Sequence, residues 1–490
     1  MNFTHKRQEF AVMLSLRTLL FVVLPLFALL VSPTSAAQKC ETSRYQTKPR
    51  LFVLTDMSNE PDDQMSLVRL LTYANEIDIQ GIAGTTSVWL NHSIDHSTIR
   101  TVISAYGNVT SNLNANVPTS APYPSADELL PKVHSGHPVY GLAALKLNAS
   151  DAARALVDAA DASSKHDPLW VTCWGGAAIL AEALSFVSNS RSLGALALFI
   201  EKLRVYSISD QDDAGAWIRE KFPALFYIVS LHGMSEYTQA TWNGISGELF
   251  RHFDKGGPDT SLVTNEWLQQ HIRKGLLGAH YPNFTFIMEG DTPSFFPLIQ
   301  NGLGDPEHPE WGSWGGRYIL EDMSGRHRVY SNAADFVQGL SGDTYLSAFA
   351  SIWRWRKGYQ QDFAARMAWT VDGSGKSNHA PVAIVNETCG PAPLQLRYKY
   401  GDSIVLDASQ SWDPDSDDLS FTWLHYREVV QRMEGEIATV SKNVTIKNLN
   451  QGGSVVTITP KDNLVRQSVS LYTQVILTMI DDALDPIGGR

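Results

Sequence analysis

Residues 50–67, RLFVLTDMSNEPDDQMSL, connect an apolar run to a segment with helical periodicity. The run predicts a buried strand, and residues 61–74 predict a helix, because apolar side chains recur there every three or four positions. Pro61 suits the first turn of such a helix, where acids cap free N–H groups and complement the helix dipole. Capping explains the acids around Pro61, but it does not explain the acid that ends the strand. The four carboxylates of this stretch are Asp56, Glu60, Asp62 and Asp63.

The same alternation of short apolar runs and amphipathic segments continues over residues 48–378. We expect strands in RLFVLTD, IDIQGIAGTT, PLWVTCW, KLRVYSISD, ALFYIVS and NFTFIMEGD, with helices over 61–74, 94–106, 151–163, 175–187 and 214–221. Strands that alternate with helices imply right-handed crossovers and a mostly parallel sheet covered on both faces. The predicted fold is therefore a doubly wound α/β domain. Two long segments rich in Gly, Trp and His, 232–282 and 300–345, are expected as insertions over one end of the sheet.

After DGSGKSNHAP the character of the sequence changes, and residues 380–490 predict a small antiparallel β-sandwich of immunoglobulin size. The stretch LDASQSWDPDSDDLSFTW resembles the polycystic-kidney-disease-type and related immunoglobulin-like repeats of secreted proteins. Its acids are either turn formers or ligands of a weak structural Ca²⁺ site: Asp413, Asp415, Asp417 and Asp418.

Composition limits the class of protein. The chain has 490 residues, 43% of them hydrophobic, which favours at least two globular domains. A net charge of −12 argues against nucleic acid as the main partner, and no later segment is long and apolar enough to span a bilayer. We expect no nucleic-acid or membrane partner, and the sequence leaves a homo-oligomer open.

The first residues predict secretion. Lys6, Arg7 and Arg17 precede the apolar run LLFVVLPLFALLV, which ends in the small residues of SPTSAA. This pattern is typical of a secretory signal peptide, assigned here to residues 1–36, with a signal anchor as the alternative. Cys40 and Cys389 are candidates for a disulfide, and Cys173 is expected to be a buried thiol. Six glycosylation sequons agree with an extracellular glycoprotein: Asn91, Asn108, Asn148, Asn283, Asn386 and Asn443.

Acids collect where the predicted strands end. In a doubly wound sheet, ligands bind beyond the carboxyl ends of the strands. Like charges brought together there repel unless a cation neutralises them, and carboxylates favour a hard cation such as Ca²⁺ or Mg²⁺. The residues that end the apolar runs are Asp56, Thr85, Thr86, Trp174, Gly175, Asp210, Asp212, Asp213 and Asp291.

LFVLTDMSNEPDDQMSL resembles the strand–loop–helix signature of nucleoside hydrolases, D-x-x-x-DD, with two more residues between the first Asp and the pair. DIQGIAGTT, LWVTCWGGAAILAEAL, SISDQDDAGAWIREKFP and MEGDTPSFF resemble later segments of that family in the same order. Residues 48–380 resemble more closely a subfamily of secreted fungal and bacterial nucleoside-hydrolase-like proteins. These end in a small immunoglobulin-like domain, and some members carry the label cellulose-binding.

The resemblance implies roles for individual residues. Asp56 matches a Ca²⁺ ligand that also serves as general base, Asp62 an acid that contacts a sugar hydroxyl, and Asp63 and Asp291 two further Ca²⁺ ligands. Trp174, or Cys173 beside it, falls where a backbone carbonyl binds the metal. The family's sugar-binding Asn is replaced by Thr86 or shifted to Asn91, and Asp210 and Asp212 replace its amide and Glu contacts with the substrate.

The sequence also departs from the family. Gly290 stands where the family has a histidine, so no leaving-group acid can be assigned there. His232, His280 and His308 are other acid candidates in the insertions. Trp311, Trp314 and Arg317 are either sugar-stacking or packing residues.

Three functions fit these features. The first is a secreted Ca²⁺-dependent glycosidase of nucleoside-hydrolase type that cleaves an N-glycosidic bond. The second is a hydrolase of the same architecture that acts on an O-glycoside of plant carbohydrate. The third is a non-catalytic protein that binds a polysaccharide such as cellulose. The expected partner is therefore a small-molecule glycoside or a carbohydrate.

Overall fold

The computed structural model describes residues 9–15, 47–246, 253–389, 392–398, 402–430, 444–460 and 473–481. The chain divides into two compact units. The α/β unit comprises Thr47–Ile299 and Ser313–Ser377. The β unit comprises Met1–Gln46, Gln300–Gly312 and Asn378–Arg490. The boundaries expected from the sequence, 48–378 and 380–490, stay predictions.

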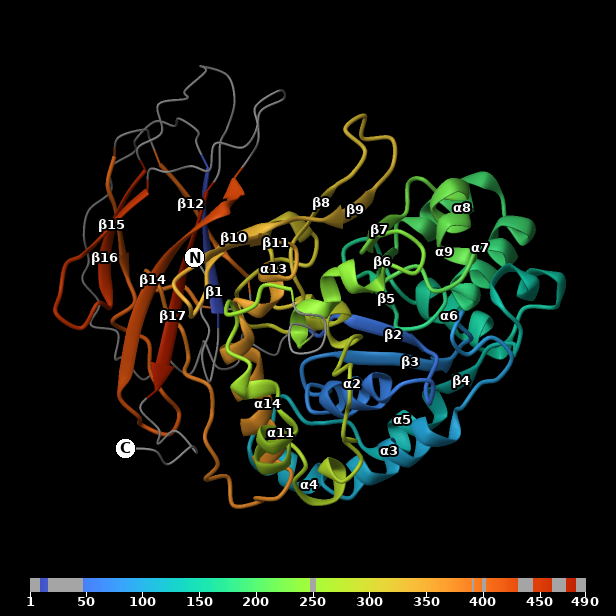
Figure 1. Ribbon diagram of the computed structural model, residues 1–490, viewed down its shortest axis with the longest axis horizontal. Coiled ribbons are helices and arrows are strands. Elements are labelled where there is room, and N and C mark those ends of the chain that lie inside the picture. The colour runs from blue at the N-terminus through green and yellow to red at the C-terminus, as the bar shows by residue number, and fades with distance from the viewer. Residues whose placement is uncertain are drawn as a thin grey trace. The chain divides into compact units, whose positions relative to one another are not determined.

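An eight-stranded sheet organises the α/β unit, in the order β4-β3-β2-β5-β6-β7-β9-β8 (Figure 1). Every neighbouring pair is parallel except β8 and β9. The predicted doubly wound, mostly parallel fold is confirmed. The strands are β2 Arg50–Thr55, β3 Asp78–Gly84, β4 Val133–Ser135, β5 Leu169–Cys173, β6 Leu203–Ser207, β7 Phe226–Val229, β8 Tyr318–Leu320 and β9 Val329–Asn332. A separate hairpin is formed by β10 Asp335–Gln338 and β11 Thr344–Ser347.

Helices follow the strands, as the alternation predicts. They are α2 Pro61–Leu71, α3 Ser97–Gly107, α4 Thr110–Ala115, α5 Ala126–Leu129, α6 Asp151–Asp161, α7 Ala178–Ser190, α8 Leu193–Ile200, α9 Ala214–Lys221, α11 Asn265–His271, α12 Gly275–Gly278, α13 Ala350–Trp353 and α14 Arg356–Trp369. Short 3₁₀ turns occur in the long connecting segments, and two of them contain or adjoin site residues: η4 Thr241–Ile245 and η6 Thr292–Ser294.

The central strand β2 is buried on both faces, which is why it reads as a continuous apolar run. Phe52 and Leu54 join one core with side chains of α6, α7 and α9. Leu51 and Val53 are equally buried but lie outside that core, and alternation along a strand places them on the opposite face. The sheet therefore holds the end of β2 in a fixed position between two packed layers.

Two expectations from the sequence were wrong in detail. The segment NFTFIMEGD forms no strand, because Glu289 takes a left-handed φ of 53° and its side chain is bonded within the protein interior. The helix expected over 94–106 begins later, at Ser97, because the Asp95 carboxylate accepts hydrogen bonds from the backbone N–H groups of Ser97 and Thr98. The edge strands β4 and β8, and β9 beside β8, were not predicted.

Two sheets, in which every strand pair is antiparallel except β1 and β12, build most of the β unit. One sheet has the order β12-β1-β17-β14 and the other β13-β16-β15. Apolar side chains from both sheets form one core, so the predicted sandwich is confirmed. The strands are β1 Glu9–Ser15, β12 Leu394–Arg397, β13 Ile404–Asp407, β14 Leu419–Val430, β15 Val444–Asn448, β16 Val455–Pro460 and β17 Thr473–Asp481.

Strand β1 belongs to the segment that the sequence assigns to a signal peptide. A signal peptide is removed from the mature protein and was therefore not expected to join the fold, but in the uncleaved chain Glu9–Ser15 pairs with β12 and β17. The signal peptide itself stays a prediction. Cys389 is disulfide-bonded, Cys173 is a buried free thiol, and Cys40 lies outside the described residues. Among the described residues, the structure contains no helix with the length and hydrophobicity needed to cross a membrane.

Candidate functional site

Four buried aspartates meet at the carboxyl end of β2. Asp56 follows the strand, Asp62 and Asp63 lie in the first turn of α2, and Asp291 directly precedes η6. Each is at most 4% exposed. Asp62, Asp63 and Asp291 each offer a carboxylate oxygen, and these three atoms lie within 4.8 Å of one another. Residues 228 positions apart thus form one acidic cluster, as the strand-end argument predicts.

The loop between β2 and α2 accommodates the two residues that exceed the nucleoside-hydrolase spacing. The N–H of Asn59 donates to the carbonyl oxygen of Asp56 at 3.2 Å, which closes a turn. Ser58 takes a left-handed φ of 76°, and its hydroxyl donates to Asp95 at 2.6 Å. The added length is therefore absorbed in a tight turn, and both ends of the loop stay beside the cluster.

The electrostatics of the cluster favour a bound cation. Burial raises the pKa of Asp56 to about 6, and burial with the charges of Glu60 and Asp56 raises the pKa of Asp62 to about 8. Burial and the neighbouring carboxylates also hold the pKa values of Asp63 and Asp291 well above the usual range. The hydroxyl of Thr55 donates a hydrogen bond to Asp63, which lowers the pKa of Asp63. Burial and the neighbouring carboxylates outweigh this effect.

An unsatisfied oxygen supports the same conclusion. Oδ2 of Asp291 is buried and has no hydrogen-bond partner among the described residues. A buried carboxylate oxygen without a donor is costly unless a positive charge faces it. The residues present therefore fit a hard cation with oxygen ligands.

Trp174 links β5 to this cluster. Its indole Nε1–H donates to the hydroxyl of Ser294 at 2.9 Å, and that hydroxyl donates to the carbonyl of Asp291 at 2.7 Å. The backbone carbonyl of Trp174 accepts a hydrogen bond from Gln211 Nε2. The carbonyl of Cys173 is used within the sheet, because it accepts the N–H of Ile208 at 3.2 Å. Of the two carbonyls predicted at the metal, that of Trp174 is thus the one beyond the strand end.

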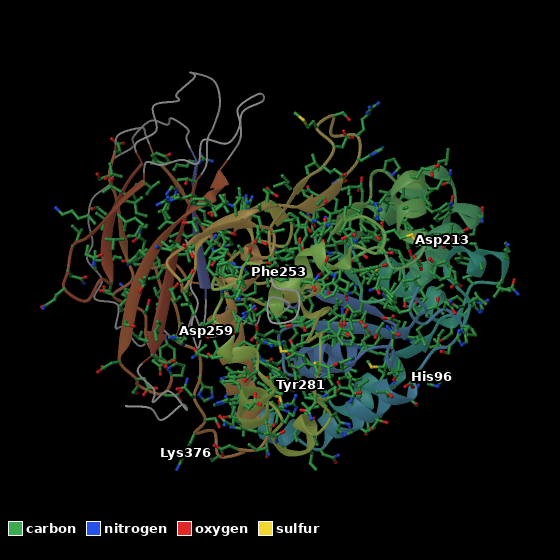
Figure 2. The ribbon with its side chains drawn as sticks, in the orientation of Figure 1. His96, Asp213, Phe253, Asp259, Tyr281 and Lys376 are labelled. Carbon is green, nitrogen blue, oxygen red and sulfur yellow. The ribbon has the colours of Figure 1, made fainter. Side chains whose placement is uncertain are left out.

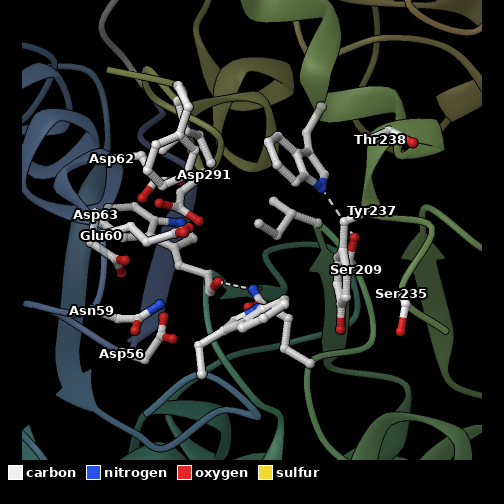
Figure 3. Close-up of a pocket in the computed structure, with 17 residues that line it drawn as sticks. Asp56, Asn59, Glu60, Asp62, Asp63, Ser209, Ser235, Tyr237, Thr238 and Asp291 are labelled. Atoms are coloured by element: carbon white, nitrogen blue, oxygen red, sulfur yellow. Dashed lines mark hydrogen bonds between the residues drawn. The ribbon is translucent and has the colours of Figure 1, made fainter. Parts of the chain in front are cut away.

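The acids form one side of a cavity of about 260 Å³ (Figure 3). Figure 3 shows Asp56, Asp62 and Asp291 across the cavity from Ser209 and Tyr237. The acidic side consists of Asp56, Asn59, Glu60, Asp62, Asp63 and Asp291. The remaining lining is largely aromatic and apolar: Trp89, Trp174, Ile208, Ser209, Gln211, Ser235, Tyr237, Thr238, Trp242, Phe286 and Ile287. A cavity with one polar side and one aromatic side suits a sugar, which presents hydroxyls on its edge and C–H groups on its faces.

Three predicted substrate contacts lie outside the cavity lining. The hydroxyl of Thr86 is turned to the carbonyl of Val139, at 2.9 Å. Asp210 forms a bidentate ion pair with Arg219 on α9, with N–O distances of 2.8 and 2.6 Å. Asp212 is buried and accepts the N–H of Ala214, and burial raises its pKa to about 7.

The other acid and stacking candidates are also placed. His232 contacts the lining residue Ser209, with Nε2 2.9 Å from its hydroxyl, but it does not line the cavity itself. His308 pairs with Glu310 and stacks on Trp311 in the β unit. Trp314 and Arg317 are buried packing residues. His280 does not line the cavity, and its backbone carbonyl accepts a hydrogen bond from Gln64 Nε2 at 2.7 Å.

Most residues of the cavity wall opposite the acids were not predicted from the sequence. Ser209 and Gln211 flank Asp210, and alternation along an extended strand end could have shown that they face away from it. Trp89 and Phe286 are half exposed at the cavity, and Trp89 packs edge to face against Tyr237 with ring centroids 5.2 Å apart. No spacing in the sequence marks these residues, because they lie in loops whose approach to the cavity depends on tertiary contacts.

Comparison with known families matches both parts of the chain. Residues 50–318 match the family model "Cellulose-binding Sde182, nucleoside hydrolase-like domain", and residues 403–486 match "Cellulose-binding protein Sde0182, C-terminal domain". The comparison with curated proteins finds no significant match.

Among solved structures, a nucleoside hydrolase-related protein from Saccharophagus degradans, associated with carbohydrate metabolism, is 30% identical. The alignment covers 89% of this chain and 96% of that one, with a TM-score of 0.70. The effector protein XOO4466 and the type III effector XopQ, the latter solved with adenosine diphosphate ribose, align at 12% and 13% identity over 69% of this chain. Their TM-scores are 0.32 and 0.30. On the family match and the 30% identical structure, the chain belongs to the Sde182 family of cellulose-binding proteins with a nucleoside hydrolase-like domain.

Proposed function

We propose that the protein is a secreted Ca²⁺-dependent glycosidase of nucleoside-hydrolase type that hydrolyses an N-glycosidic bond. The observation that carries this proposal is the position of the acidic cluster, which lies at one side of a cavity whose other side is aromatic. The family's nucleoside hydrolase-like domain supports the reaction class.

The proposed metal ligands are Asp56, Asp63, Asp291 and the carbonyl of Trp174. Bound Ca²⁺ would neutralise these carboxylates and hold a sugar diol and the attacking water in one place. The unsatisfied Oδ2 of Asp291 is the atom that gains most from such an ion, because it is buried without a donor.

Asp56 is the proposed general base. An oxygen of its carboxylate takes a proton from water while the water oxygen bonds to the anomeric carbon and the C–N bond breaks through an oxocarbenium-like state. The leaving nitrogen keeps the electron pair of the broken bond. Asp62 accepts a hydrogen bond from a sugar hydroxyl and so orients the ring.

No side chain is assigned as leaving-group acid. Glu289, next to the position where nucleoside hydrolases have a histidine, has no solvent exposure and is bonded to Arg69. The aromatic side of the cavity, formed in part by Trp89 and Tyr237, would stack on the leaving base or on a second sugar. The second possibility leaves an O-glycoside of plant carbohydrate as an alternative substrate.

A non-catalytic polysaccharide-binding protein is the other candidate function. The name of the family supports it, because both matched models carry the term cellulose-binding. Half-exposed aromatic side chains at the cavity, Trp89 and Phe286, are also typical of surfaces that hold sugar chains.

A hydrolysis screen separates these functions. Purified protein is incubated with nucleosides and with plant oligosaccharides, with Ca²⁺ or with a chelator. The glycosidase proposal expects cleavage that the chelator abolishes and that Asp56→Asn lowers by about 10²- to 10⁴-fold. Asp158→Asn, an exposed site on α6, removes the same charge and should leave the rate unchanged.

The outcomes differ for each function. Cleavage by Asp56→Asn at the wild-type rate would overturn the mechanism. Retention on insoluble cellulose without hydrolysis of any substrate, equal with and without chelator, would favour the binding function. Secretion is tested by sequencing the N-terminus of protein recovered from the medium, which should begin at residue 37.

A further inference from the structure

A second group of carboxylates lies in the β unit, in the loop that leads into β14. Asp413, Asp415 and Asp417 occupy alternate positions of the sequence DPDSD, and each offers an oxygen within 4.8 Å of the other two. Alternate acids at the first, third and fifth positions of a loop are the spacing by which Ca²⁺-binding loops present their oxygens. Ser416, at φ 68°, lets the loop fold back so that the acids converge.

Hydrogen bonds from the backbone of the loop converge on the side chain of Asp413. Oδ1 of this residue accepts the backbone N–H of Asp415 at 2.8 Å and that of Asp417 at 3.4 Å. Its other oxygen, Oδ2, is buried and has no hydrogen-bond partner among the described residues. The whole residue is only 7% exposed. An aspartate that forms a turn uses one carboxylate oxygen to accept backbone N–H groups. Turn formation therefore accounts for Oδ1 of Asp413 but not for the buried Oδ2.

Further negative charge lies near Asp413. Asp481, which ends β17, is 4% exposed, and the pairing of β14 with β17 sets it opposite Leu419, two residues beyond Asp417. Burial together with the charges of Asp481 and Asp415 raises the pKa of Asp413 to about 6. Carboxylates gathered at one place are stable when a cation neutralises them.

The loop also holds the beginning of the segment that enters the β unit. The backbone N–H of His379 donates to Asp415 Oδ2 at 2.6 Å, and the Nδ1 atom of its ring lies 2.9 Å from Oδ1. Asn378 Nδ2 donates to Asp481 Oδ2 at 3.4 Å. An ion at this place would therefore fix residues 378–379 to the ends of both β14 and β17.

We propose that the β unit binds a structural Ca²⁺ ion through Asp413, Asp415 and Asp417, beside Asp481, and that this ion fastens the entry segment to the sandwich. The site is independent of the acidic cluster in the α/β unit. Structural Ca²⁺ in extracellular modules typically binds with a Kd of about 10⁻⁴ to 10⁻³ M, so the site should fill at millimolar Ca²⁺.

The test counts Ca²⁺ bound to the full-length protein by equilibrium dialysis. Asp413→Asn keeps the shape and the Oδ1 acceptor but replaces the unsatisfied oxygen by an amide. We expect it to lose one Ca²⁺ per chain and to lose the rise in melting temperature that Ca²⁺ gives the wild-type β unit. The matched control is Asp418→Asn, an exposed acid next to the cluster, which should bind as many ions as the wild type.

Asp63→Asn separates this site from the other one, because it should remove Ca²⁺ from the α/β unit alone. Equal Ca²⁺ counts for wild type and Asp413→Asn at millimolar Ca²⁺ would overturn the proposal, and so would equal losses in Asp413→Asn and Asp418→Asn. Saturation by Mg²⁺ with no preference for Ca²⁺ would overturn the assignment of the ion. If Asp413→Asn does not fold, Asp417→Asn gives the same comparison at a partly exposed position.

Discussion

Arg69 on α2 and Glu289 form an ion pair in which neither side chain is exposed, with Arg69 Nε 2.5 Å from Glu289 Oε2 and Nη2 3.1 Å from Oε1. The pair joins the helix that carries Asp62 and Asp63 to the loop that carries Asp291. Tyr281, labelled in Figure 2, also donates to Glu289, at 2.5 Å. The ion pair therefore sets the distance between the two halves of the acidic cluster.

Glu289→Gln should destabilise the protein strongly. The amide keeps the size of the side chain but leaves the buried guanidinium of Arg69 without its counter-charge, and breaking such a pair typically costs about 3–5 kcal/mol. Urea unfolding with chelator present measures this loss. Glu220→Gln breaks an exposed pair with Lys221 and should change the free energy of unfolding by less than about 1 kcal/mol. Equal stability of Glu289→Gln and wild type would show that the pair does not hold α2 to the loop.

The stability of the metal-free protein should fall as the pH rises from about 4 to about 8. The pKa of Asp62 is raised to about 8 and that of Asp56 to about 6 in the folded state, whereas unfolded aspartate titrates near pH 4. Between these pH values the folded state retains protons that the unfolded state has lost. Each unit of rise in pH therefore lowers the free energy of unfolding.

Urea unfolding at pH 5, 6, 7 and 8 measures this slope, with chelator and with Ca²⁺. Bound Ca²⁺ stabilises the ionised carboxylates, so the fall should be smaller when it is present. Asp62→Asn should flatten the slope in chelator, because it removes the group whose pKa is raised to about 8. Stability that rises with pH in chelator would contradict the proton uptake expected from the buried cluster.

The sequence predicted the half of the site that local patterns encode. Asp56, Asp62 and Asp63 lie within one strand–loop–helix unit, where hydrophobic periodicity places the strand end and Pro61 marks the helix start. Asp291 was predicted at the correct edge but in the wrong element, a strand instead of a turn. The turn depends on Glu289, whose partner Arg69 lies 220 residues away, and no local pattern encodes that pair.

Asp210 shows why a strand-end rule is incomplete. It follows β6 as the rule requires, yet Arg219 on α9 neutralises it outside the cavity lining. The same strand end contributes Ser209 and Gln211 to the cavity instead. Which side of the chain faces a ligand is decided by the packing of the next helix, and that packing is a tertiary property.

Gly290→Ala should disturb the acidic cluster directly. A Cβ atom at this position would lie 2.7 Å from Asp62 Oδ2, closer than real Cβ contacts, and 3.0 Å from a ring carbon of Trp242, which is tight. Displacing a catalytic group by about 1 Å can lower the rate by about 10²-fold. We expect a loss of that size in kcat/KM and weaker Ca²⁺ binding.

The control is Gly194→Ala on α8, where the added Cβ atom has no atom within 4 Å, so this variant should keep full activity. Unchanged Ca²⁺ binding and activity in Gly290→Ala would mean that Asp62 is not part of the site.

Trp89→Ala should weaken binding of the ligand more than it slows the reaction. The indole is 52% exposed at the cavity and rests against Tyr237, so it offers a face on which a base or a sugar can stack. An aromatic contact of this kind contributes about 0.5–1.5 kcal/mol, which corresponds to a two- to tenfold rise in KM. Because stacking acts equally on the bound substrate and on the transition state, kcat should stay nearly constant.

Retention on cellulose, if the protein binds it through this cavity, should fall by a similar factor. Leu193→Ala, 86% exposed on α8 and outside the cavity lining, is the control for loss of an exposed apolar side chain. A fall in kcat with KM unchanged would instead place Trp89 in the chemical step.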